Sequence, residues 1–162
     1  MRELDVVGVR VEMPSNNPIV LLRERGGDRY LPIWVGASEA SAIAFAQNGV
    51  VPPRPLTHDL LKDVIEALGR TLEEVRITEI KDNVFHAELA FDGGLVIGSR
   101  SSDAIALALR VGCRIVGADE VLEAGGVAVP DEDDDEVEKF REFLEQISPE
   151  DFGTTPAGEG ES

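Results

Sequence analysis

The chain has 162 residues and a formal net charge of −17 at pH 7, and it is long enough for one domain with a substantial core. Residues 131–162 hold 13 of the 32 acidic side chains against Lys139 and Arg141, so −11 of the charge lies there and −6 is left for residues 1–130. This balance excludes a broad cationic surface, the usual basis of non-specific nucleic-acid binding. Nucleic acid stays open as a partner only through a local basic patch.

Cys113 is the single cysteine, so no disulfide forms within the chain. It lies in an apolar segment, which favours a buried thiol over a nucleophile. No apolar run approaches the roughly 20 residues of a membrane-spanning helix, and the first residues carry no apolar signal segment. We therefore expect a cytoplasmic protein with no membrane partner.

The first part of the chain predicts three strands. Residues 4–12 carry valine at alternate positions, which is typical of a half-buried strand. Turn-forming residues separate this segment from the apolar segments 19–25 and 30–35, so an antiparallel meander is expected. Pro32 has no N–H for a sheet ladder, which places its strand at an edge or at a bulge.

Two helices are predicted next. Ser38 is a suitable N-cap for a helix over residues 39–47, where alternate alanines allow close packing. A proline-rich segment then leads to Thr57, a second suitable N-cap. Apolar residues at helical spacing after it predict an amphipathic helix over residues 58–68.

The same pattern then repeats. Residues 75–81, 84–91 and 95–99 predict a second three-stranded meander, and Ser102 is the expected cap of a buried helix over residues 103–111. We expect an α/β fold of the α+β type, with two related halves that each place a helix after a β-meander. The sheet should be mixed and mainly antiparallel, with a further helix at the C-terminus.

The predicted domain spans residues 1–130 and closes with a short strand over residues 114–117 and a helix over residues 119–124. Beyond it the composition changes to acidic and then to small polar residues. The further predicted segments are an acidic linker (131–136), an amphipathic helix with its exit (137–152) and a disordered tail (153–162).

Glu39 and Asp103 occupy equivalent places in the two halves, directly after the serine caps. If the halves pack about a pseudo-twofold axis, the two carboxylates approach each other, and their oxygens suit Mg²⁺ or Mn²⁺. An acid at a helix N-terminus is also stabilised by the helix dipole, by about 0.3–1 kcal/mol, without any ligand. Both interpretations stay open at this point.

A second group of candidates lies in the segment 54–59, which brings an arginine, a histidine and an aspartate to one helix start. This combination suits phosphate or another anion, although the same residues are also ordinary choices for a solvated loop and a helix start. Arg100, beside Asp103, is placed either to pair with that acid or to bind phosphate. The candidates within the segment are Arg54, His58 and Asp59.

Three motifs together resemble the bifunctional nuclease family of bacteria and plants: residues 31–36 with Glu39-Ala40, residues 54–60, and residues 100–110. The likeness covers about residues 3–130 with the motifs in the same order, and it is greatest to actinobacterial members, which also carry an acidic linker and a terminal helix. Ser101 stands where the family usually has proline. The resemblance implies an α/β fold of antiparallel meanders with helices, and DNase and RNase activity.

The first hypothesis from this resemblance is a metal-dependent nuclease that hydrolyses phosphodiester bonds of DNA or RNA. The second is a non-catalytic oligomeric binding or regulatory module, in which the matched residues cap helices and form an interface. A homodimer is expected under both, because the helices are apolar and one strand lies at an edge. The predicted roles are catalytic residues His58, Asp59 and Asp103, metal ligands Glu39, Asp59 and Asp103 for Mg²⁺ or Mn²⁺, and phosphate-binding residues Arg54 and Arg100.

Overall fold

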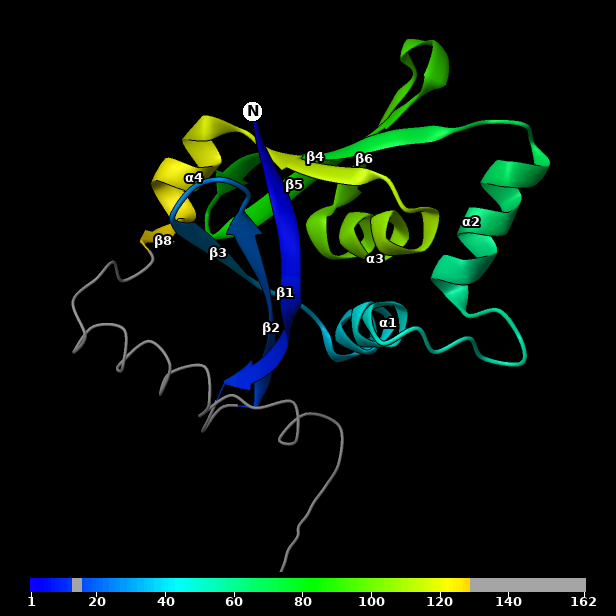
Figure 1. Ribbon diagram of the computed structural model, residues 1–162, viewed down its shortest axis with the longest axis horizontal. Coiled ribbons are helices and arrows are strands. Elements are labelled where there is room, and N and C mark those ends of the chain that lie inside the picture. The colour runs from blue at the N-terminus through cyan, green and yellow to red at the C-terminus, as the bar shows by residue number, and fades with distance from the viewer. Residues whose placement is uncertain (13–15, 129–162) are drawn as a thin grey trace, which may run out of the picture.

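The computed structural model describes residues 1–12 and 16–128, and the predicted linker, C-terminal helix and tail lie outside these residues (Figure 1). The fold combines strands and helices in the order that the sequence predicts. The elements are β1 (Arg2–Glu12), β2 (Asn17–Glu24), β3 (Arg29–Trp34), α1 (Ala37–Gln47), α2 (Thr57–Ala67), β4 (Leu72–Lys81), β5 (Val84–Phe91), a short 3-10 turn (Asp92–Gly94), β6 (Val96–Arg100), α3 (Ser101–Val111), β7 (Arg114–Gly117), α4 (Asp119–Gly125) and β8 (Val127–Ala128).

The described strands form one sheet in the order β6-β5-β4-β7-β1-β2-β3-β8. Each half contributes an antiparallel meander, and β7 joins the two by pairing antiparallel to β1 and parallel to β4. The predicted mixed, mainly antiparallel sheet of two related halves is therefore confirmed. The two-residue strand β8, which was not predicted, pairs with β3 only at Arg29 and Tyr30, so Pro32 has no strand beside it on that edge within the described residues.

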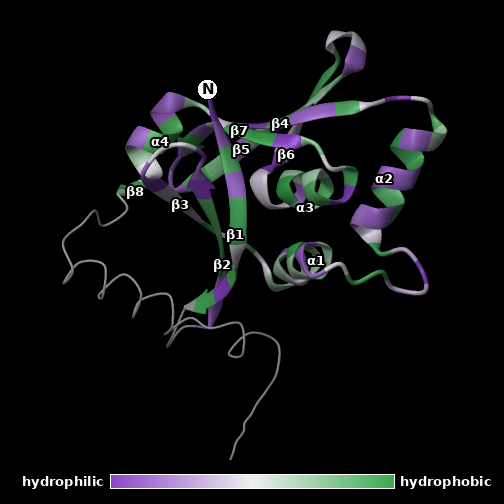
Figure 2. Cartoon of the chain, in the orientation of Figure 1, coloured by the Kyte–Doolittle hydropathy of each residue, from purple (hydrophilic) through white to green (hydrophobic). Residues whose placement is uncertain are grey.

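Helices α1 and α3 lie side by side in Figure 1, with α2 beyond the far end of α3. Most of α3 is buried, including Ile105 and Leu107, because small alanines alternate with the large aliphatic residues and let the helix approach its neighbours closely. One aliphatic core joins α1, α3, α4 and the sheet. Helix α2 differs, since His58 is its only buried residue and its surface alternates hydrophilic and hydrophobic side chains (Figure 2).

The predicted N-caps are wrong by one or two residues. The first three helices, α1 to α3, begin earlier than the sequence suggested, and none of them has a side-chain hydrogen bond from its N-cap residue. As a result Glu39, Asp59 and Asp103 each stand at the third helical position, where a carboxylate can accept from the free N–H groups of the first turn and remove the need for a hydroxyl cap. The observed N-caps are Gly36, Leu56 and Arg100 in place of Ser38, Thr57 and Ser102.

Among the described residues no helix is both long enough and apolar enough to cross a membrane.

Acid should destabilise the fold, because several carboxylates form ion pairs that lower their pKa. The clearest is the buried Glu24: hydrogen bonds from Arg29 hold its pKa below the usual 4.5 in spite of the burial, and Arg2 adds attraction. The folded state therefore binds fewer protons than the unfolded chain below about pH 4.5, and stability falls as the pH drops through the folded pKa.

We expect the melting temperature to stay nearly constant from neutral pH down to about pH 5 and then to fall steeply, with Glu24→Gln less acid-sensitive than the parent. Calorimetry across this pH range checks the expectation. Equal acid sensitivity in the two proteins would show that Glu24 carries none of the effect.

Candidate functional site

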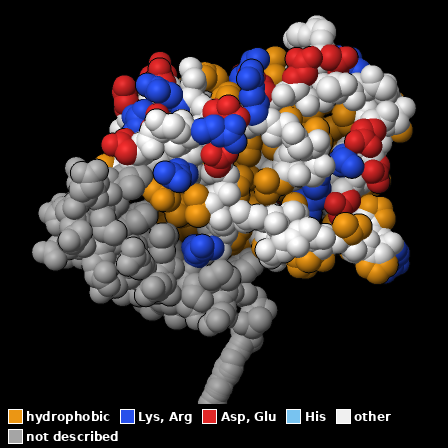
Figure 3. Space-filling view, viewed as in Figure 1, with side chains coloured by type: hydrophobic (Ala, Val, Ile, Leu, Met, Phe, Trp, Pro, Cys, Tyr) orange, Lys and Arg blue, Asp and Glu red, His pale blue; other side chains and the backbone are white. Residues whose placement is uncertain are grey.

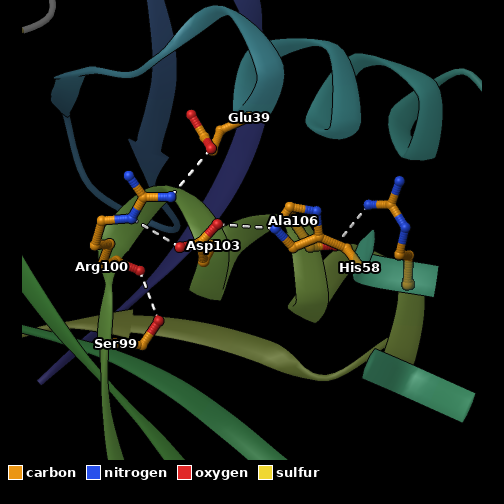
Figure 4. Close-up of polar contacts among 7 residues, drawn as sticks. Glu39, His58, Ser99, Arg100, Asp103 and Ala106 are labelled. Atoms are coloured by element: carbon orange, nitrogen blue, oxygen red, sulfur yellow. Dashed lines mark hydrogen bonds and ion pairs between the residues drawn. The ribbon is translucent and has the colours of Figure 1, made fainter. Parts of the chain in front are cut away.

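Two strand-to-helix junctions meet at one point, although they follow strands near opposite edges of the sheet. Because α1 and α3 pack against each other, Glu39 at the start of α1 faces the start of α3 (Figure 4). Arg100, the N-cap residue of α3, bridges the two junctions: its Nη2 lies 3.0 Å from Glu39 Oε2, and its Nε donates to Asp103 Oδ2 at 2.8 Å. The two predicted carboxylates are thus brought together by a shared cation.

His58 extends this arrangement from a third helix. Its Nε2 lies 2.9 Å from Asp103 Oδ1, and only 10% of the side chain is exposed. The start of α2 therefore meets the start of α3, as a site composed of both would require. His58, Asp103, Arg100 and Glu39 form a continuous line of polar contacts, which we call the polar row (Figure 4).

The charge state of Asp103 fixes how the imidazole is oriented. Burial alone would raise the pKa of Asp103, but hydrogen bonds from Arg100 and His58 outweigh it and hold the pKa below the usual 3.8. Near neutral pH the ionised carboxylate only accepts hydrogen bonds, so the hydrogen in the His58–Asp103 contact is on Nε2. In a neutral imidazole the lone pair is then on Nδ1, which has no hydrogen-bond partner among the described residues.

The polar row lines a cleft of about 1120 Å³. Arg100 is 67% exposed and uses Nε and Nη2 in the row, which leaves Nη1 without a partner among the described residues. The cleft combines this polar wall with apolar side chains, as ligand sites in proteins commonly do. The apolar residues include Leu61 and Ile65 of α2, Leu89 and Phe91 of β5, and Ile97 of β6.

Asp59 and Arg54 lie outside the polar row. Asp59 Oδ1 accepts from Arg110 Nε at 2.6 Å, and its Oδ2 accepts from the N–H of Leu56 at 3.0 Å, so the carboxylate lines a different hollow. Burial opposes ionisation of Asp59, but these hydrogen bonds prevail and its pKa is lowered. Arg54 is exposed and forms no hydrogen bond or ion pair within the part of the chain that the structure describes.

Arg110 is a residue that the sequence reasoning did not single out. Its side chain is only 6% exposed and joins two helices, through Asp59 of α2 and the carbonyl oxygen of Ala106 at 2.9 Å. A lone arginine near the end of an apolar helix is ordinarily explained by the helix dipole. The sequence signal that could have identified Arg110 is that α3 is otherwise apolar near this position, so a cation there needs a buried partner.

The polar row contains suitable donors for a metal ion, but these donors are not already arranged around an ion site. Two carboxylates with water and substrate oxygens are a common way to hold Mg²⁺, and Glu39 and Asp103 are of this type. Arg100 now bridges them, and the described residues contain no group of three or more His, Cys, Asp or Glu side chains placed to share an ion. The three-carboxylate metal site stays a prediction.

The thiol of Cys113 is not prepared for nucleophilic chemistry. Burial raises its pKa to about 11, so the thiol is protonated near neutral pH.

The fold and the site define an α+β protein with an aspartate-oriented histidine and an exposed arginine on one wall of a cleft. The chain belongs to the bifunctional nuclease domain family, whose model matches residues 20–130. It is 54% identical over 164 aligned residues to an uncharacterised protein of Mycobacterium tuberculosis strain H37Rv, covering 96% of this chain and 100% of that protein. It is also 28% identical over 106 residues to bifunctional nuclease 1 of Oryza sativa subsp. japonica, covering 62% of this chain and 31% of the rice protein.

Proposed function

We propose that this protein hydrolyses phosphodiester bonds of nucleic acid at the polar row. The observation that carries the proposal is the contact of 2.9 Å between His58 and Asp103 on the wall of a cleft that Arg100 also lines. Membership of a family named for nuclease activity supports the same conclusion. It agrees with the first hypothesis from the sequence.

In this proposal each member of the row has a defined role. His58 takes a proton from the attacking water through Nδ1, while Asp103 holds the ring and stabilises the imidazolium that forms. Arg100 presents Nη1 to a phosphate oxygen, a charge-assisted contact in a partly enclosed site. Glu39 keeps the guanidinium oriented toward the cleft.

The charge of the row argues for a cation in the reaction. Glu39, Asp103 and Arg100 together carry a net charge of −1, which does not attract phosphate. Mg²⁺ or Mn²⁺ held by Glu39 and Asp103 would supply positive charge to the phosphate and lower the pKa of bound water. The ion is part of the proposal, and Arg100 would have to release at least one of the carboxylates to admit it.

The proposal is tested with labelled single-stranded DNA and RNA, incubated with purified protein and Mg²⁺, Mn²⁺ or a chelator. We expect cleavage by the parent and almost none by Asp103→Asn purified in parallel, which serves as the control for contaminating nucleases. Cleavage that survives the chelator would remove the metal from the proposal. Equal rates for parent and variant, or no cleavage under any condition, would overturn the nuclease function.

The second candidate is a non-catalytic oligomeric module, and the exposed apolar surface of α2 favours it. Leu60, Leu61 and Val64 of this helix are exposed, and Leu68 at its end is 73% exposed. Figure 3 shows hydrophobic side chains at the surface over this end of the molecule, interspersed with acidic and basic ones. A patch of this kind commonly marks an interface.

We expect a homodimer through the α2 surface, which is compatible with either function. Sedimentation equilibrium should give a dimer for the parent and a monomer for the double variant Val64→Glu, Leu68→Glu. Val51→Glu is the matched control, because Val51 is even more exposed, at 88%, but lies outside α2. A monomeric parent at micromolar concentration would contradict the expectation.

A further inference from the structure

A second hollow adjoins the polar row and contains an unusually exposed aromatic residue. Trp34, the only tryptophan of the chain, is the last residue of β3 and is 53% exposed. It lines a hollow of about 460 Å³ between the ends of the two meanders. This volume lies within the roughly 300–1,000 Å³ typical of small-ligand sites.

The lining of this hollow suits a neutral aromatic group next to an anion. Within the described part of the chain Arg100 is its only charged lining residue, so no carboxylate of that part faces it although the protein as a whole is acidic. The amides of Asn17 and Asn83 offer donors and acceptors, and Val84 and Phe85 add apolar surface. A cationic group would be repelled by Arg100 and would meet no carboxylate of the described residues, whereas a heterocyclic base finds a stacking face and hydrogen-bonding edges.

Arg100 lines both the Trp34 hollow and the cleft of the polar row. We propose that the Trp34 hollow holds one unpaired base of a single-stranded nucleic acid, stacked on the indole of Trp34, while the neighbouring phosphate contacts Arg100 in the cleft. The proposal rests on the proposed function, and it adds a base-binding subsite that places the strand across the polar row.

The geometry favours a single strand over a duplex. Stacking needs the face of a base, and in a duplex both faces are covered by neighbouring bases. A strand that binds through base stacking also depends little on electrostatic attraction of its phosphates, which the acidic surface does not provide. We therefore expect the protein to bind unpaired regions and to show little base preference.

Tryptophan emission tests the stacking directly, because all of it comes from Trp34. His58→Gln protein is titrated with an oligothymidylate about eight nucleotides long, so that binding is measured with little turnover. We expect quenching that saturates, and little quenching by an abasic strand with the same number of phosphates or by a duplex of the same length. Emission that none of the strands changes, or that all three change equally, would overturn the proposal.

Variants of Trp34 give a second measurement. Trp34→Ala should weaken binding of the labelled oligothymidylate about tenfold or more and raise KM by a similar factor, whereas Trp34→Phe should retain most of the affinity. Phe45→Ala is the matched control, since Phe45 is a partly exposed aromatic residue that lines neither hollow.

The outcomes separate this proposal from the proposed function. If the parent cleaves oligonucleotides but Trp34→Ala binds and cleaves them equally well, the base subsite is wrong and the nuclease function stands. If the parent never cleaves but base-dependent quenching is found and Trp34→Ala loses it, the subsite stands and the catalytic assignment is wrong.

Discussion

Replacing His58 with glutamine is expected to lower kcat on single-stranded oligonucleotides by about 10²- to 10⁴-fold, because the amide can still donate to Asp103 but cannot take a proton from water. KM should change little, since the phosphate contact is assigned to Arg100. Initial rates across substrate concentration measure both constants. The melting temperature is measured in parallel, because His58 is the one buried residue of α2.

The variant Asp103→Asn tests whether His58 acts together with Asp103. An amide at position 103 leaves the imidazole without an anionic partner, so kcat should fall nearly as far as in His58→Gln. The double variant should be little slower than either single variant, because the two residues act as one unit. A folded His58→Gln protein that cleaves at the parent rate would instead assign the His58–Asp103 contact to holding α2 against α3.

Much of the fold was predictable because the local pattern agrees with the final structure. The alternating valines of β1 determine the first meander locally. The Asp82-Asn83 turn does the same for the second meander, because its positive φ angles of 53° and 64° suit a tight hairpin. The place of β7 between the halves was not predictable, since a four-residue apolar strand carries no information about which strands it will join. The two-residue β8 is too short to show any pattern.

The site was predictable in its members more than in its contacts. The repeat placed Glu39 and Asp103 at equivalent junctions, and the structure joins them through Arg100. The sequence could not show which of two acidic candidates, Asp59 or Asp103, contacts His58, because both follow a helix start. Only the packing of α2 on α3 shows that Asp103 meets the imidazole while Asp59 meets a buried arginine.

Asp59→Ala is expected to destabilise the protein by about 3–5 kcal/mol, because it leaves the buried guanidinium of Arg110 without its carboxylate. Arg110→Met should cost less, about 1–3 kcal/mol, since Asp59 is 26% exposed and keeps water and the N–H of Leu56 as partners. Urea unfolding measures both, and the double variant should be less destabilised than the sum of the two, because the contact can be broken only once.

The same pair of variants decides between two roles for Asp59. If the Asp59–Arg110 contact positions α2, both variants should lower kcat by displacing His58, and Mn²⁺ affinity measured by calorimetry should be the same in both and close to that of the parent. If Asp59 is the metal ligand that the sequence predicted, only Asp59→Ala should lose Mn²⁺ affinity, and Arg110→Met should keep it. Because His58 is the one buried residue of α2 and Ile65 is only partly buried against the core, we expect the first result, in which the buried Arg110 of the neighbouring helix positions His58.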